Sequence, residues 1–354
     1  MADRINIGVS IVIATFNSEK VLERTLNAIA KQSYPQEDIE ILIVDGGSTD
    51  QTLLIAQKFH CKIVNNPKTE PVNAKLLGAQ NAHGKYLIYV DHDEVFENRD
   101  SIKNRVNALQ EHPECKAAFC SGYKRPPQYP ALNQYISEFG DPFSCFIYHT
   151  SKDYNFFYKF LLKNYTLINE YDDYYIFSFE NSKKNIIVEL CCLGTMIDLE
   201  YFKSTTNMLL DPNQLVQLFY LMLEQKKFLV IVDKNDALLH YSVDSIKAYL
   251  PKLKWRIRNN VHYVDKAQQG FGGRTAFQKG VNLKKYLFVL YTIFFPASFV
   301  HATYLAITRK NSVYLLHPFL CIYVVYHIGI EMIKKWIGIK PIFTSYDGKK
   351  KIGG

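Results

Sequence analysis

The chain has 354 residues, of which 48% are hydrophobic and 21% are charged, so it carries enough apolar side chains for about two domains and too many for a disordered chain. Its 17 glycines and 13 prolines exclude collagen-like and low-complexity classes. The net charge of +8 favours an anionic partner, namely nucleic acid, a phosphorylated small molecule or an acidic membrane surface, and composition does not choose among them. Seven cysteines without a C-x-x-C pair fit neither a zinc site nor a secreted disulfide framework and indicate a reducing cytoplasm.

Short apolar runs rich in β-branched residues predict five strands within the first 125 residues. They lie at 10–15, 39–44, 61–64, 86–90 and 117–121. Helical patterns separate the first four of them, and strands that alternate with helices are joined by crossovers and pair mostly parallel. We therefore predict an α/β fold with a mostly parallel central sheet, in which ligands bind outside the carboxyl ends of the strands.

Three helices are expected between these strands. The first is predicted to be capped by Asn17 or Ser18, the second by Ser48 and Gln51 at capping-box spacing, and the third to cover 72–82. Apolar residues at helical spacing predict the sides that face the core. These are Leu22, Leu26 and Ile29 in the first helix and Leu54, Ile55 and Phe59 in the second.

An acidic motif follows the fourth strand directly. Asp91 and Asp93 stand one residue apart, and Glu94 comes next. Two carboxylates at a strand end suit a hard divalent cation, such as Mn²⁺ or Mg²⁺, that bridges a pyrophosphate. The plainer alternative is a strand end that carries solvated acids.

A glycine turn, Asp45 to Asp50, follows the second strand. Gly46 and Gly47 allow a tight turn and a close approach of the backbone to a ligand, and the amide groups behind Ser48 suit an anion. The alternative is an ordinary turn between a strand and a helix. The sequence has neither a G-x-G-x-x-G nor a Walker A motif, which argues against dinucleotide and P-loop sites.

Three segments of the first hundred residues stand in a specific order and spacing. They read S-I-V-I-A-T-F-N at 10–17, I-L-I-V-D-G-G-S-T-D-Q-T at 41–52 and N-A-K-L-L-G-A-Q-N-A-H-G-K-Y-L-I-Y-V-D-H-D at 73–93. This arrangement resembles the family 2 glycosyltransferases of the GT-A fold, over residues 8–95 and more loosely to residue 260. The resemblance implies a nucleotide-sugar donor, a divalent cation and the transfer of a sugar.

The resemblance also implies roles for residues of this chain. It implies a nucleotide-sugar site made by Thr15, Phe16, Asn17, Asp45, Lys75 and Asp91, and a metal site made by Asp93, Asp91 and His240. Family members often carry a second acid where this chain has Gly46, which leaves the choice between UDP and another nucleotide open. Lys75 as a solvated helix lysine and His240 as a structural histidine are the alternatives at those two positions.

The catalytic base is harder to place. The family keeps a Glu-Asp pair just before a helix that we expect at 215–226, and the sequence there reads Asp211-Pro212 instead. Asp211 is the nearest acid, with a turn-forming aspartate before proline as the alternative, and Glu189 is the next candidate for the base. The segment 125–185 is expected to lack regular structure and to form the acceptor side.

Two long stretches without a formal charge lie near the C-terminus, at 286–307 and 313–330. Each is long enough to reach across a hydrocarbon core of about 30 Å at about 1.5 Å per residue. Lysines flank the pair on both sides, which suits acidic lipid headgroups. The alternatives are a hairpin of two spanning helices, a re-entrant or interfacial pair, and a soluble core or dimer element, and the first two place the protein at a membrane.

These observations predict a GT-A fold in three segments. Residues 1–125 form the nucleotide-sugar-binding half, 126–280 the acceptor-side half with a basic linker, and 281–354 two hydrophobic helices, as a membrane hairpin or interfacial pair, with a basic tail.

The predicted enzyme is a Mn²⁺- or Mg²⁺-dependent, inverting hexosyl- or N-acetylhexosaminyltransferase. It would take a nucleotide sugar, with UDP favoured, and act on a lipid-linked glycan at the cytoplasmic face of a membrane, in polysaccharide biosynthesis. The alternatives are a polyprenyl-phosphate glycosyltransferase and a membrane-anchored nucleotide-sugar-binding protein without catalysis. No nucleic acid is expected as a partner, and a homo-oligomer stays open.

Overall fold

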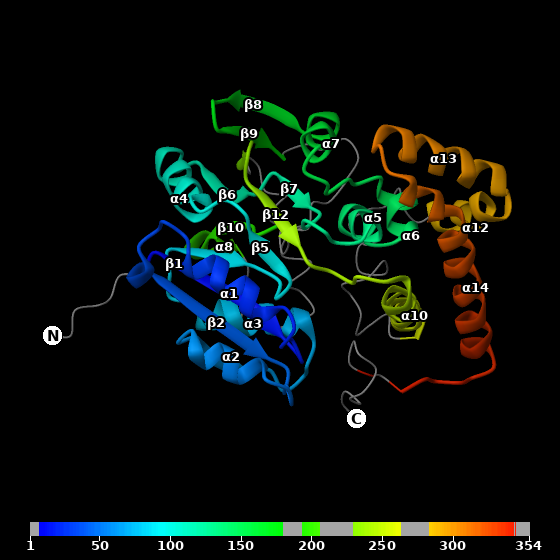
Figure 1. Cartoon of the computed structure of the whole chain (residues 1–354), viewed down its shortest axis with the longest axis horizontal. Coiled ribbons are helices and arrows are strands. Elements are labelled where there is room, and N and C mark those ends of the chain that lie inside the picture. The colour runs from blue at the N-terminus through cyan, green and yellow to red at the C-terminus, as the bar shows by residue number, and fades with distance from the viewer. Residues whose placement is uncertain (1–6, 180–192, 206–228, 263–282, 343, 345–354) are drawn as a thin grey trace. The chain divides into compact units, whose positions relative to one another are not determined.

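The computed structural model describes residues 7–179, 193–205, 229–262, 283–342 and 344 (Figure 1). Within this part the chain divides into two units, each with its own packed interior. The first, called the N-terminal unit here, comprises residues 7–124, 154–179, 193–205 and 229–241. The second, the C-terminal unit, comprises 125–153, 242–262, 283–342 and 344.

A central sheet runs through the N-terminal unit, in the strand order β3-β2-β1-β4-β10-β6-β11-β9-β8 among the described residues. The strands are β1 Val9–Thr15, β2 Ile39–Asp45, β3 Lys62–Asn65, β4 Tyr86–Tyr89, β6 Cys115–Phe119, β8 Thr166–Glu170, β9 Tyr174–Ser178, β10 Met196–Asp198 and β11 Leu229–Asp233. The five strands predicted from the first 125 residues are confirmed. The middle residues of β1 and β2 are fully buried, as expected of strands covered on both faces.

The predicted α/β fold is confirmed, and its central sheet is mixed. The β3-β2-β1-β4 run and the β6–β11 pair are parallel, whereas β10 pairs antiparallel with both β4 and β6. β8 and β9 are joined by a short loop, which fixes them as an antiparallel hairpin, and β9 is also antiparallel to β11. Regular alternation with crossover helices, on which the prediction rested, therefore ends after β6.

A second, three-stranded sheet lies in the same unit, in the order β5-β12-β7. Its strands are β5 Glu94–Phe96, β7 Gly122–Lys124 and β12 Ala237–His240. β12 is antiparallel to β5, with His240 opposite Glu94, and parallel to β7. This pairing brings residue 240 to the acidic motif, although nearly 150 residues separate them in sequence.

The helices of the N-terminal unit are α1 Leu22–Ala30, α2 Thr52–Lys58, α3 Pro71–Asn81, α4 Ser101–Glu111, α7 Phe157–Asn164 and α8 Leu199–Thr205, with a short 3₁₀ turn, η1 Gln36–Asp38. The core-facing side of α1 is confirmed, because all three of its predicted residues are fully buried. In α2, Ile55 is buried, Phe59 is half-buried and Leu54 is 53% exposed, so the prediction for Leu54 is wrong. A helix of seven residues buries a narrower stripe than its apolar pattern suggests.

Both predicted helix caps are wrong. Val21 and Gln51 occupy the N-cap positions, and neither caps its helix with a side chain. The predicted caps bond elsewhere: the Ser48 hydroxyl donates to Asp45, and the Asn17 amide oxygen accepts from the Thr49 amide. Short polar side chains can bond to any nearby backbone or side-chain group, and here they bond within the loops that follow β1 and β2 rather than at a helix terminus.

A fully buried arginine, Arg105 of α4, ties the end of the central sheet together. Its guanidinium donates to the carbonyl groups of Ser101 and Gly194 and to the Ser101 hydroxyl. Its Nε atom lies 3.7 Å from Asp233 and 3.6 Å from Asp236, both of which are buried. Burial, and next the charge of Asp236, raise the pKa of Asp233 well above its ordinary value.

Helices make up the described part of the C-terminal unit almost entirely. They are α5 Ala131–Phe139, α6 Pro142–Tyr148, α10 Ile246–His262, α12 Lys284–Ile293, α13 Phe295–Thr308, the 3₁₀ turn η4 Ser312–Leu316, and α14 His317–Trp336. Their interior is aromatic and aliphatic. The prediction that 125–185 lacks regular structure is wrong, because α5, α6, α7, β8 and β9 lie there. Leu132, Tyr135, Ile136 and Phe139 follow helical spacing, but a segment this rich in aromatic residues hides the period.

Polar side chains are embedded in this helical core as hydrogen-bonded pairs. Glu138 is fully buried and accepts hydrogen bonds from Arg309, Ser151 and Tyr314. His317 is fully buried as well and is held by the hydroxyl group of Tyr135. The carboxylate and the imidazole are therefore both satisfied inside an apolar unit, as buried polar groups must be.

The first apolar stretch near the C-terminus is not one straight helix. It breaks at Phe294 into α12 and α13, which are bent by 94°. The second stretch belongs to the continuous segment Ser312–Trp336, which by length and composition alone is long and apolar enough to cross a membrane. Among the described residues one straight helix therefore has the length and composition of a span, and α12 with α13 adds a second only as a broken span.

Candidate active site

Polar loops follow three neighbouring parallel strands, β2, β1 and β4, at the same edge of the central sheet. The loop after β2 is closed by Asp45. One carboxylate oxygen accepts hydrogen bonds from the hydroxyl groups of Thr15, at 3.0 Å, and Ser48. The other accepts from the backbone amides of Gly47 and Ser48, both at 2.8 Å. Asp45 therefore locks the glycine turn against the end of β1.

Asn17 fixes the loop after β1 against the same turn. Its backbone φ is +49°, a left-handed conformation that asparagine tolerates better than most residues. Its backbone N–H donates to the Ser48 hydroxyl at 2.9 Å, and its side-chain oxygen accepts from the backbone N–H of Thr49 at 2.9 Å. The two loops that are expected to hold the nucleoside thus support each other before any ligand binds.

Close packing explains why residue 46 is a glycine. A Cβ atom placed there would lie 2.9 Å from Thr69 Cγ2 and 3.4 Å from the ring of Phe16. The Thr69 hydroxyl also donates to the Gly46 carbonyl at 2.9 Å. The acid that family members often carry at this position would not fit without a shift of Thr69.

Lys75 lies beside the acidic motif. It is 8% exposed, and its ammonium group is 3.1 Å from an Asp91 carboxylate oxygen and 5.9 Å from the centre of the Tyr89 ring. The reading of Lys75 as a solvated helix lysine is therefore wrong. A buried cation at the carboxyl end of β4 suits donor phosphates.

Asp93 and His240 come together where β12 ends beside the beginning of β5. The imidazole Nε2 atom of His240 is 3.7 Å from a carboxylate oxygen of Asp93. The ring stacks on Tyr123, with centroids 4.5 Å apart, and the Tyr241 amide donates to the Asp93 carbonyl at 2.7 Å. The imidazole is thus held at the motif from its face and through the adjoining backbone.

Glu94 is the fully buried acid of the motif. It accepts a hydrogen bond from the Tyr123 hydroxyl, and accepts another from the Asp91 amide at 3.1 Å. Burial, and next the neighbouring Asp91 charge, raise the pKa of Glu94. In the sequence Glu94 stands out only as the acid that follows the aspartate pair, and Tyr123 does not stand out, because no local pattern marks a tyrosine that β7 of the three-stranded sheet brings to the motif.

The donor set fits a hard or borderline divalent cation. Ligands about 2.1 Å from an octahedral ion lie about 3 Å apart when adjacent, so the 3.7 Å between Asp93 and His240 needs only a small side-chain adjustment. Carboxylate with imidazole suits Mn²⁺ and admits Mg²⁺. In the structure Asp91 is engaged with Lys75 instead.

Two expected residues lie outside the described part of the chain. These are Asp211 and Glu189, the candidates for the base, and the structure gives neither a position. The other expected residues fall into groups. Thr15, Asn17 and Asp45 are joined by hydrogen bonds, Asn17 through Ser48, and the Phe16 ring lies beside Gly46. Lys75 with Asp91 and Asp93 with His240 form two pairs.

Another cluster of metal-binding side chains lies among the described residues of the C-terminal unit. Ligand atoms of Cys145, His301 and His317 lie within 4.8 Å of one another. The Tyr291 hydroxyl already bonds His301 Nδ1 at 2.8 Å and His317 Nε2 at 2.9 Å, and the Tyr135 hydroxyl bonds the other nitrogen of His317. Hydrogen bonding within the protein explains this cluster.

The family model described as Glycosyl transferase family 2 matches residues 10–183, the stretch that holds the acidic motif and its surrounding loops. The chain carries a family 2 glycosyltransferase domain. The family 2 domain has the mixed α/β sheet of the GT-A fold. A solved mannosyltransferase of Pyrobaculum calidifontis, in complex with GDP-Man and Mn²⁺, shares this fold with a TM-score of 0.51 at 14% identity, over 94% of this chain and 89% of that one.

Two curated relatives each match a stretch of about 110 residues of the chain. The poly(ribitol-phosphate) beta-N-acetylglucosaminyltransferase TarS of Staphylococcus aureus is 33% identical over 109 residues, 29% of this chain and 19% of that protein. A dolichyl N-acetyl-alpha-D-glucosaminyl phosphate 3-beta-D-2,3-diacetamido-2,3-dideoxy-beta-D-glucuronosyltransferase of Methanococcus voltae is 39% identical over 110 residues, 29% of this chain and 34% of that protein. The matched stretch thus spans only 19% and 34% of the length of these two relatives.

Proposed function

We propose that the chain is a metal-dependent, inverting glycosyltransferase that moves a sugar from a nucleotide-sugar donor, with UDP favoured, to a lipid-linked glycan at the cytoplasmic face of a membrane. The observation that carries the proposal is the arrangement at the end of β4, where a buried lysine, an aspartate pair and a histidine converge. A cation, two carboxylates and an imidazole at one sheet edge suit a diphosphate held through a metal ion.

In this proposal each loop has a separate task. Thr15, Phe16, Asn17 and Asp45 hold the nucleoside, Lys75 contacts the donor phosphates, and Asp91 turns toward the ribose. Asp93 and His240 would hold Mn²⁺ or Mg²⁺, which neutralises the diphosphate as it leaves. The loops around Asp45 are already closed by hydrogen bonds, so little ordering is needed when the donor binds.

The acceptor hydroxyl needs a base, and we propose Asp211, with Glu189 as the second candidate. Such a base takes the proton from the hydroxyl while the oxygen attacks the anomeric carbon from the side opposite the leaving diphosphate. The relatives support this acceptor class, since their names specify poly(ribitol-phosphate) and a dolichyl-linked sugar. We take the transferred sugar to be a hexose or an N-acetylhexosamine.

A polyprenyl phosphate is the second candidate acceptor. The observation in its favour is the sequence Asp211-Pro212, which replaces the Glu-Asp pair expected before the helix. A phosphate oxygen is already anionic and needs no strong base. A nucleotide-sugar-binding protein without catalysis is the third candidate, on the same observation.

The test is transfer from labelled UDP-glucose, UDP-N-acetylglucosamine and GDP-mannose by the full chain, with Mn²⁺ or with EDTA. We expect one donor to react with Mn²⁺ and none with EDTA. Asp93→Asn should abolish transfer and the Mn²⁺-dependent part of donor binding, while Glu97→Gln, an exposed acid just after the motif, should leave both intact. Full activity in EDTA contradicts the metal role, and Mn²⁺-dependent donor binding without turnover supports the binding protein.

Asp211→Asn separates the two acceptor classes. With a sugar hydroxyl as acceptor, turnover should fall by about 10² to 10⁴, with donor affinity nearly unchanged. With a polyprenyl phosphate the loss should be smaller than about threefold, since no base is needed. A small loss with a hydroxyl acceptor shifts the role of base to Glu189.

A further inference from the structure

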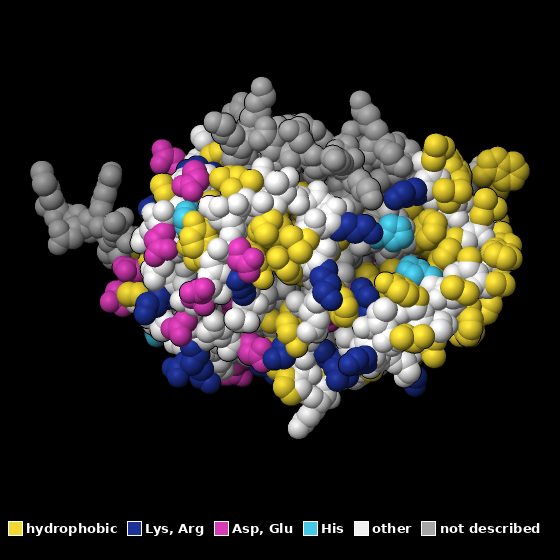
Figure 2. All heavy atoms as spheres, turned by 90° about the horizontal axis from the view of Figure 1, so that it is seen from above, with side chains coloured by type: hydrophobic (Ala, Val, Ile, Leu, Met, Phe, Trp, Pro, Cys, Tyr) yellow, Lys and Arg dark blue, Asp and Glu magenta, His cyan; other side chains and the backbone are white. Residues whose placement is uncertain are grey.

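The C-terminal unit exposes apolar side chains on one set of helices. Of the large hydrophobic side chains that are exposed in the described part of the chain, seven lie in residues 7–262 and twenty-two in residues 283–342. Figure 2 shows hydrophobic side chains gathered over α12, α13 and α14, with few charged ones among them. Soluble surfaces rarely carry an apolar patch of this extent, so it marks an interaction surface. We call it the apolar face.

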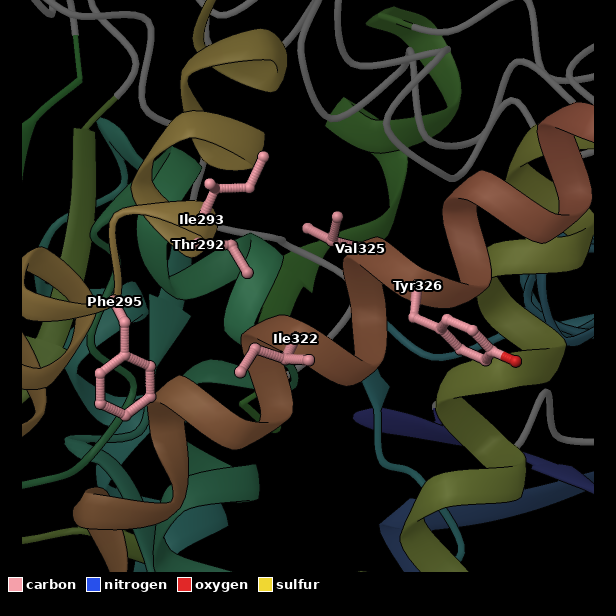
Figure 3. Close-up of a pocket in the computed structure, with 6 residues that line it drawn as sticks. All are labelled: Thr292, Ile293, Phe295, Ile322, Val325 and Tyr326. Atoms are coloured by element: carbon pink, nitrogen blue, oxygen red, sulfur yellow. The ribbon is translucent and has the colours of Figure 1, made fainter.

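Several side chains of the apolar face are exposed over most of their surface. Ile293 is 73% exposed, Ile307 71% and Trp336 87%. An open apolar pocket of about 320 Å³ lies in the same face, between α12 and α14 (Figure 3). It is lined by Thr292, Ile293, Phe295, Ile322, Val325 and Tyr326.

The charges around the apolar face are nearly all positive. Residues 283–342 contain seven lysines and arginines and a single acid, Glu331. That acid is 1% exposed and is paired with His262 and Lys334, so it contributes no negative surface. Lysines stand at the beginning of α12 and at the end of α14, where anionic lipid headgroups would meet them.

Neither α12 nor α13 is long enough to cross a bilayer. Their 10 and 14 residues rise about 15 Å and 21 Å, against a hydrocarbon core of about 30 Å. A 94° bend separates them, so together they form a span only as one that is broken at Phe294. Two short apolar helices at a right angle instead suit the boundary between headgroups and acyl chains.

α14 is long enough, but its packing partner opposes a crossing. It lies along α10, with the Tyr323 hydroxyl on the Leu250 carbonyl at 3.2 Å and the Lys335 ammonium on the Val261 carbonyl at 2.7 Å. Between those two contact points α10 carries Lys252, Lys254, Arg256 and Arg258. A spanning α14 would draw these four cations into the hydrocarbon, where charges are costly.

We propose that the apolar face of α12–α14 inserts into one leaflet of an anionic membrane and binds the chain there without crossing it. The exposed aromatic residues, with Tyr286 64% and Tyr326 62% exposed, suit the headgroup level, where aromatic side chains concentrate. The inference extends the proposed function, because it supplies the surface at which a lipid-linked acceptor is met. Its test contains no donor, so its failure leaves sugar transfer standing.

The test is flotation of the full chain with vesicles of phosphatidylcholine alone or with about one third phosphatidylglycerol, a charge density at which basic residues add measurably to binding. We expect flotation with the anionic vesicles and at least severalfold less with the neutral ones. The double variant Ile293→Glu/Ile307→Glu should lose flotation at least fivefold. The matched control Leu54→Glu/Ile168→Glu, at exposed apolar positions of the N-terminal unit, should float as the wild type does.

Four outcomes decide the inference. Release of membrane-bound chain by alkaline carbonate supports one-leaflet binding, whereas retention overturns it in favour of a span. Absence of flotation by the folded full chain in both vesicle types overturns it as well. Concentration-dependent dimers that the double variant abolishes, with no vesicle binding, would assign the apolar face to a second copy of the chain.

Discussion

Replacement of Arg105 by methionine should be among the most destabilising single changes in the N-terminal unit. The guanidinium is fully buried, and it faces two buried aspartates while it donates to two carbonyl groups. Burial, and next the charge of Asp236, raise the pKa of Asp233, and the Arg105 cation offsets the negative charge of this buried pair. Arg105→Met fills a similar volume but leaves that charge buried without a cation.

The expected loss is about 3 to 5 kcal/mol at pH 7, the usual cost of removing one partner of a buried ion pair. Much of it is the cost of protonating a carboxyl group to keep it buried, at about 1.4 kcal/mol for each pH unit above an ordinary aspartate pKa near 3.9. In the variant the carboxyl thus has a raised folded-state pKa, and its folded form binds more protons than its unfolded form. The deficit should therefore shrink by about 2 to 3 kcal/mol when the pH falls from 7 to 5.

Urea unfolding of both proteins at pH 7 and pH 5, followed by far-ultraviolet circular dichroism, measures the effect. Arg125→Met, at an exposed arginine, is the control and should stay within about 0.5 kcal/mol of the wild type. Adding Asp236→Asn to Arg105→Met should restore part of the loss, because it removes the stranded charge. A deficit that is equal at both pH values would refute the electrostatic reasoning and leave lost packing as the cause.

Three further predictions follow from single side chains. Lys75→Met should raise the donor KM by about 10- to 100-fold, the loss of a charged hydrogen bond, and Lys75→Arg should retain most of the affinity, as steady-state kinetics will show. Gly46→Ala should lower the melting temperature through the 2.9 Å approach to Thr69, whereas Gly329→Ala, where no atom lies within 4 Å, should raise stability by up to about 1 kcal/mol. Burial lowers the pKa of His317 to about 3, so the stability that the neutral imidazole contributes should be full above pH 6.5 and fall as the pH drops from there toward 3. The stability of His317→Gln should fall less steeply over the same range. Scanning calorimetry measures both, and an equal pH dependence would contradict the prediction.

The part of the site that lies in one stretch of chain was predictable from the sequence. Asp91 and Asp93 follow an apolar strand directly, so their place at a sheet edge depends only on that strand being parallel to its neighbours. The glycine turn at Asp45 follows its strand in the same way. His240 was placed by family resemblance alone, because its contact with Asp93 depends on the pairing of β12 with β5.

Interactions between distant segments were not predictable. Arg105, with Asp233 and Asp236, reads as ordinary surface charge in the sequence, and only the packing of α4 beside β11 makes it a buried cluster. Leu54 fits the apolar stripe of α2 and yet lies exposed, since a helix of two turns has room for few core contacts. Hydrophobic periodicity specifies which side of an element is apolar and does not specify what covers it.

The three acids after β4 have different surroundings, and this difference accounts for their different proposed roles. Asp91 faces the Lys75 ammonium, which balances its charge. Glu94 is buried and accepts hydrogen bonds from the Tyr123 hydroxyl and from a backbone amide, so its role is to hold the loop in place. Asp93 lies next to the imidazole of His240, a side chain that binds divalent metals in its neutral form. Asp93 with His240 would therefore be the pair that holds a divalent cation, because a cation beside Asp91 would meet the charge of Lys75.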